Sequence, residues 1–163
     1  MKLEPIELPN LYELRGYLEA VSDLVRTGQL KWYFDTKLFE MDVLEFSIQE
    51  LIKSAYPQSH PDSATITECS EPDMLDTLNH EFSRWLPSVG EGGRFPLPLL
   101  DSDGQLWRYV KECVGQEQSR RFEYTTLARL DEFGATGICG GFAFVIVNEA
   151  SRRCLFIRGG ADD

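Results

Sequence analysis

The feature that most constrains the fold is an uninterrupted apolar run near the C-terminal end of the chain. Residues Gly141–Val147 read GFAFVIV and combine aromatic and β-branched side chains without a polar residue. Such a run predicts a central strand that is buried on both faces of a sheet. A turn-forming stretch from Asn148 to Arg152 follows, and Arg153–Arg158 is again suited to a strand. The pattern therefore predicts an antiparallel β-hairpin.

Helical periodicity dominates the first part of the chain. Apolar residues at intervals of three and four predict a helix over about residues 11–27. Asn10 and Glu13 can satisfy free backbone N–H groups at its start, and Gly28 can end it. The aromatic segment Lys31–Phe39 fits either a short strand or a loop packed on the core.

Two further helices are predicted from capping patterns. Asp42 with Glu45 predicts the start of a helix that ends before Pro57 and has Leu44, Ile48, Leu51, Ile52 and Ala55 on its apolar face. Ser70 with Asp73 predicts the start of the next helix. The stretch from Pro57 to Cys69 between them is predicted to be a polar loop.

The remaining segments indicate the fold class. Residues 87–98 are rich in Gly and Pro and predict an irregular connection between a helical acidic part, about 1–86, and a mixed part, 99–158. In the mixed part, Leu106–Val114 fits a helix that ends at Gly115, with a strand as the alternative, and Phe122–Thr126 fits a strand. We predict one α+β domain over residues 1–163, with N-terminal helices packed against a C-terminal antiparallel sheet.

The net charge of −11 is unevenly distributed. Residues 1–103 contain 19 acidic and 8 basic residues, whereas residues 104–163 contain 8 of each. Between Asp35 and Glu81 the chain has 11 acidic and only 2 basic residues. A field of this sign repels nucleic acids and anionic membranes, and it attracts basic proteins and speeds their encounter. A solvated surface that keeps the protein soluble is the alternative explanation.

Cysteine usage and hydropathy indicate the compartment. Cys69, Cys113, Cys139 and Cys154 form no CxxC pair, which favours reduced thiols over a two-disulfide framework. The first residues lack the basic and apolar stretches of a secretion signal. The longest apolar run has six residues, against the roughly 20 that a membrane helix needs. We therefore expect a cytoplasmic protein.

One segment resembles a catalytic motif. PLPLLDSDGQLW, ending at Trp107, resembles the first motif of haloacid-dehalogenase-type phosphatases, an apolar strand followed by D-x-D-G-T-L. The resemblance implies that Asp101 is a nucleophile and Asp103 a general acid. Gln105 replaces the usual Thr, and no second acidic pair for Mg²⁺ follows an apolar strand downstream. A structural Asp-Gly turn explains the same residues.

Three other patterns lack the context that their chemistry requires. The glycines of Gly134–Gly141 precede a strand, whereas a phosphate-binding loop opens a helix. The sequence around Cys139 resembles that near a papain-like nucleophile, but no His follows it, as that family requires. His60, Cys69 and His80 match no zinc-site spacing. We expect no metal and no cofactor.

These observations favour a non-catalytic binding protein over an enzyme. The proposed type is a bacterial immunity protein or antitoxin that neutralises a basic protein partner, and neither nucleic acid nor membrane is expected as a partner. The pairs Arg120–Arg121 and Arg152–Arg153 form no basic stripe and can contact the acidic part of the same fold. A carboxylate-dependent hydrolase and an accessory subunit with an exposed apolar patch around residues 32–39 are the alternatives. The predicted contact residues are Asp35, Glu40, Glu50, Asp76 and Glu81, with Trp32 or Tyr33 as an aromatic anchor.

Overall fold

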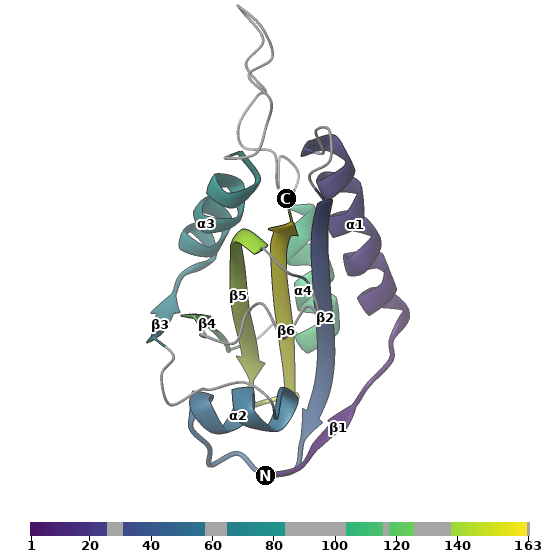
Figure 1. Ribbon diagram of the computed structural model, residues 1–163. Helices are drawn as coiled ribbons and strands as arrows, with labels where there is room; N and C mark the ends of the chain where they lie inside the picture. Colours follow the sequence, from purple (N-terminus) through teal and green to yellow (C-terminus); the bar gives the residue numbers. More distant parts are fainter. Residues whose placement is uncertain (26–30, 58–64, 84–103, 116–117, 126–137, 163) are drawn as a thin grey trace, which may run out of the picture.

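A six-stranded antiparallel sheet with the strand order β1-β2-β6-β5-β4-β3 organises the protein (Figure 1). The computed structural model describes residues 1–25, 31–57, 65–83, 104–115, 118–125 and 138–162. Within these residues the strands are β1 (Leu3–Pro5), β2 (Lys31–Met41), β3 (Thr65–Cys69), β4 (Ser119–Thr125), β5 (Ile138–Asn148) and β6 (Arg153–Asp162). The N-terminal and C-terminal parts of the chain therefore share one sheet.

Helices cover the two faces of the sheet unequally. Helices α1 (Pro9–Val25), α3 (Glu71–Ser83) and α4 (Gln105–Val114) pack on one face, where they form the larger hydrophobic cluster. The short helix α2 (Ile48–Ala55) lies across one end of the other face (Figure 1). Its buried residues Leu51, Ile52 and Ala55 belong to the second cluster.

Strand β5 lies between β4 and β6, and its residues Phe142–Asn148 are all buried. Phe142, Phe144 and Ile146 enter the larger cluster, whereas Ala143, Val145 and Val147 enter the second one. This alternation between two covered faces removes any need for polar residues, because neither face meets water. The predicted central strand and its hairpin with β6 are confirmed.

The predicted α+β class is confirmed, but the sheet is not confined to the C-terminal part. Residues 31–41 form an 11-residue strand, which settles the open choice between strand and loop. The prediction of a polar loop up to Cys69 was wrong, because Thr65–Cys69 pairs with β4. As an edge strand with several exposed residues, β3 tolerates the polar composition that suggested a loop.

The predicted end residues are confirmed for α3 and α4 but not for the start of α1. Ser70 and Asp73 exchange side-chain to backbone hydrogen bonds at the start of α3, and Gly115 with φ 99° ends α4, as predicted. Helix α1 begins at Pro9, so Asn10 lies inside the first turn rather than at the cap. Its Nδ2 instead donates to Oε2 of Glu112, a residue of α4. None of the described helices combines the length and the apolar character needed to cross a bilayer.

Candidate partner-binding surface

The predicted contact residue Asp35 has a structural partner. It lies on β2 directly opposite Arg158 of β6, and Nη2 of Arg158 donates to Oδ2 of Asp35 at 2.7 Å. The Arg158 side chain is only 4% exposed, and that of Asp35 is 26% exposed. A charge buried to this degree requires a counter-charge. Asp35 therefore neutralises Arg158, and only a quarter of its side chain is accessible to a partner.

The ring of Tyr56, at the C-terminal end of α2, covers this ion pair. The Arg158 guanidinium carbon lies 3.4 Å from the Tyr56 ring centroid, and Nζ of Lys37 lies 4.4 Å from it. The ring also meets Phe156 edge-on at 5.4 Å. Burial raises the pKa of Tyr56 above its usual range, while Arg158 opposes the rise. These contacts attach α2 to the sheet.

The predicted contact residue Glu50 also has a partner within the fold, because it takes part in capping α2. Ser47 is the N-cap of α2, its Oγ accepts from the N–H of Glu50, and Glu50 accepts from the N–H of Ser47. The predicted capping pair Asp42 and Glu45 was therefore placed five residues too early. Both pairs fit the same local pattern, so the local signal alone could not separate them.

Because α2 starts five residues later than predicted, the segment before it is not helical. Residues 42–47, here called the 42–47 loop, connect β2 to α2. Glu45 is exposed and plays no capping part, and Leu44, predicted on the buried helix face, is 43% exposed. Asp42 accepts from the N–H of Lys2 through Oδ1 at 3.0 Å. The sequence pattern that could have predicted this later helix start is the capping pair Ser47 and Glu50.

The other predicted contact residues are spread over different elements. Glu40 is exposed on β2, and Asp76 is exposed on α3. Neither carboxylate has a described cation within ion-pair distance. Trp32 and Tyr33 pair with Ala161 and Gly160 through the β2–β6 backbone, and Glu81 belongs to α3; the structure does not describe the side chains of Trp32, Tyr33 and Glu81. The four contact residues whose side chains are described therefore lie on three elements: Asp35 and Glu40 on β2, Glu50 on α2 and Asp76 on α3.

Basic side chains of the C-terminal part contact the acidic part. Arg120 donates twice to Glu68, at 3.0 and 3.1 Å, and this bonding holds the pKa of Glu68 below its usual value. Arg121 lies 2.8 Å from Glu71, which also lies 3.7 Å from Lys111. The protein's own cations thus neutralise part of the acidic segment.

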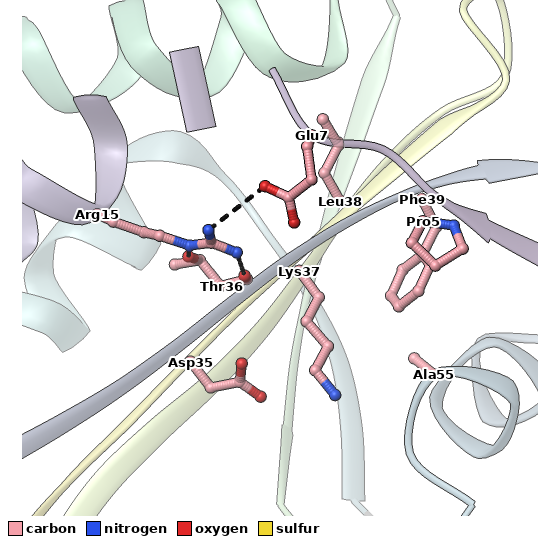
Figure 2. Close-up of a pocket in the computed structure, with 9 residues that line it drawn as sticks. All are labelled: Pro5, Glu7, Arg15, Asp35, Thr36, Lys37, Leu38, Phe39 and Ala55. Atoms are coloured by element: carbon pink, nitrogen blue, oxygen red, sulfur yellow. Dashed lines mark hydrogen bonds and ion pairs between the residues drawn. The ribbon is translucent and has the colours of Figure 1, made fainter. Parts of the chain in front are cut away.

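A groove of about 360 Å³ lies beside β2 where β1 has ended (Figure 2). Arg15 of α1 points into it and donates to Oγ1 and to the carbonyl oxygen of Thr36, at 2.7 and 2.6 Å. Figure 2 shows Asp35 and Lys37 on the other side of the strand. Because Arg15 occupies a carbonyl that an added strand would use, it protects this sheet edge.

The candidate catalytic and metal-binding groups lie only partly within the described residues. Asp101, Asp103 and His60 lie outside these residues. Cys69, Cys113 and Cys154 are free thiols, and burial raises the pKa of Cys113 to about 11 and that of Cys154 to about 12. Thiols with such values stay protonated and unreactive at neutral pH. In the described part of the chain, no group of three His, Cys, Asp or Glu residues could hold a metal ion.

Solved structures provide one comparison. A crystal structure of MAF1 from citrus superimposes with a TM-score of 0.57 over 91% of this chain and 98% of the chain in that crystal structure. The chain shares its fold with MAF1. A second crystal form of citrus MAF1 gives a TM-score of 0.56 over 89% of this chain. The identities to MAF1 are 16% and 18%, so the likeness concerns the fold alone. No protein-family model and no curated protein matches the sequence.

Proposed function

We propose that this protein is a non-catalytic binding protein that neutralises a basic protein partner through an exposed acidic surface. The proposed biological type is a bacterial immunity protein or antitoxin that blocks a basic toxin. The net charge of −11 provides the long-range attraction, and partners of opposite charge associate faster than neutral ones.

One observation carries the proposal. Arg120, Arg121 and Arg158 are committed to internal carboxylates, whereas Glu40, Glu45 and Asp76 are exposed without a described cation within ion-pair distance. Arg152 and Arg153 donate to backbone carbonyl oxygens. None of these five arginines forms a described ion pair with the three carboxylates, which therefore remain available to cations of a partner.

The test is surface plasmon resonance against the product of the neighbouring gene at 50 and 300 mM NaCl. The association rate is expected to fall about tenfold or more between these salt concentrations, because screening shortens the reach of the acidic field. Glu40→Lys and Asp76→Lys are expected to lower the association rate, and Glu19→Lys, with the same charge change on α1, serves as the matched control.

Two results would contradict the proposal. One is an absence of binding to this protein at both salt concentrations. The other is tight binding whose association rate depends neither on salt nor on the charge of Glu40 and Asp76.

A further inference from the structure

Exposed apolar side chains gather at one end of the sheet. The described residues include four large apolar side chains with substantial exposure: Met1 at 43%, Val43 at 40%, Leu44 at 43% and Tyr12 at 59%. Tyr12 belongs to α1. The N–H of Asp42 donates to the carbonyl oxygen of Lys2, which extends the β1–β2 pairing and brings Met1 towards Val43. Met1, Val43 and Leu44 are here called the end patch.

The local fold does not account for this exposure. Phe46, in the same loop, packs against the second hydrophobic cluster, as does Leu3 of β1. Capping by Ser47 fixes where the helix starts, so Val43 and Leu44 precede it. The loop thus packs one large side chain against the core and leaves two exposed. Grouped exposed apolar side chains with a polar rim are typical of protein-interaction sites.

The rim of the end patch is acidic. Residues 38–52 contain Glu40, Asp42, Glu45 and Glu50 and no basic residue. Three cations lie near this end: Lys2 lies 3.0 Å from Glu4, and Nη2 of Arg152 donates to the carbonyl oxygen of Asp42. Arg153, the register partner of Glu40 on β6, donates to the carbonyl oxygen of Cys113. Glu40 and Glu45 flank Val43 and Leu44 in the sequence, and neither forms an ion pair with a described cation.

From this arrangement we infer that the end patch is the docking site for the basic partner of the proposed function. The partner surface that fits has an apolar side chain at its centre, seated against Val43 and Leu44, and Lys or Arg around it, facing Glu40 and Glu45. Apolar contact at the centre slows dissociation of the complex, and the charged rim speeds association and orients the partner. This inference rests on the proposed function and adds the location of the interface.

The experiment compares Leu44→Asp with Tyr12→Ser in binding to the product of the neighbouring gene, by surface plasmon resonance at 150 mM NaCl. Both changes remove an exposed apolar side chain, but only the first lies in the end patch. Leu44→Asp is expected to weaken binding at least tenfold, mainly through faster dissociation, and Tyr12→Ser to change it less than about twofold. Glu45→Lys is expected to slow association.

Hydrogen exchange gives a second readout on the wild-type chain, independent of any substitution. The amides of the 42–47 loop are expected to gain protection in the complex. Binding that is unchanged by Leu44→Asp, with no protection of this loop, overturns the end patch as the interface and leaves the proposed function intact. A wild-type chain that does not bind overturns the proposed function and the interface with it. A thermal unfolding midpoint unchanged in Leu44→Asp separates lost contact from lost folding.

Discussion

Asp35 and Arg158 face each other directly across the β2–β6 pair, with 2.7 Å between Oδ2 and Nη2. They are 123 residues apart in the sequence, and the ring of Tyr56 covers the guanidinium. An acidic residue that the charge pattern assigned to a partner is thus engaged inside the fold. Its substitution is expected to affect stability before binding.

Asp35→Asn is expected to destabilise the protein by about 2 kcal/mol, since it removes the carboxylate from an arginine that is almost completely buried. The cost stays below that of a fully buried pair because Asp35 is partly exposed. Urea unfolding measures the change. Asp76→Asn, at an exposed position of α3, is the control and is expected to stay within about 0.5 kcal/mol of wild type. Equal effects of the two changes would show that the ion pair does not stabilise the fold.

Ser47→Ala is expected to lower the free energy of unfolding by about 1 kcal/mol, because it removes the N-cap acceptor of the Glu50 N–H. Glu45→Ala is the matched control and is expected to have almost no effect, since Glu45 takes no part in capping. Chemical denaturation of both variants tests where α2 begins. A larger loss in Glu45→Ala than in Ser47→Ala would favour the earlier helix start.

Gly159→Ala and Gly16→Ala are expected to have opposite effects. A Cβ at position 159 would lie 2.7 Å from Cζ of Phe142 and 3.1 Å from Cδ1 of Phe34, so the rings must shift, at a cost of about 1–3 kcal/mol. A Cβ at position 16 meets nothing within 4 Å and lies in α1, where Ala stabilises by about 0.5–1 kcal/mol relative to Gly. Thermal unfolding should show the midpoint falling in the first variant and rising in the second.

Alkaline pH is expected to destabilise the protein through its buried thiols. The folded-state pKa values, about 11 for Cys113 and about 12 for Cys154, exceed the ordinary value of 9.0. Above pH 9 the unfolded chain therefore binds fewer protons than the folded one, and the free energy of unfolding falls as pH rises. The contribution of these thiols is complete below pH 9 and decreases between pH 9 and 12.

Urea unfolding at pH 8 and pH 10 measures this loss. Cys154→Ala is expected to show a smaller difference between the two pH values than wild type, because one of the two titrating thiols is gone. The same pH difference in both proteins would assign the loss to other groups, such as the tyrosines, whose ordinary pKa is near 10.

The sequence by itself determined the elements whose signals are local. The apolar run at Gly141–Val147 defined the central strand, and Ser70 with Asp73 marked the start of α3, because burial on both faces and capping depend on residues a few positions apart. The charge count likewise predicted an acidic protein that suits a basic partner, and that function remains a proposal.

Only the tertiary structure decided which strands pair and which charges are neutralised. Strand β2 joins β6, and Arg158 neutralises Asp35, through contacts that no local pattern encodes. Two equivalent capping patterns competed for α2, and the folded protein forms the later one, Ser47 with Glu50, which leaves Val43 and Leu44 exposed. The reason is physical: periodicity and capping act within a few residues, whereas the burial and pairing of a side chain depend on distant segments that the fold brings against it.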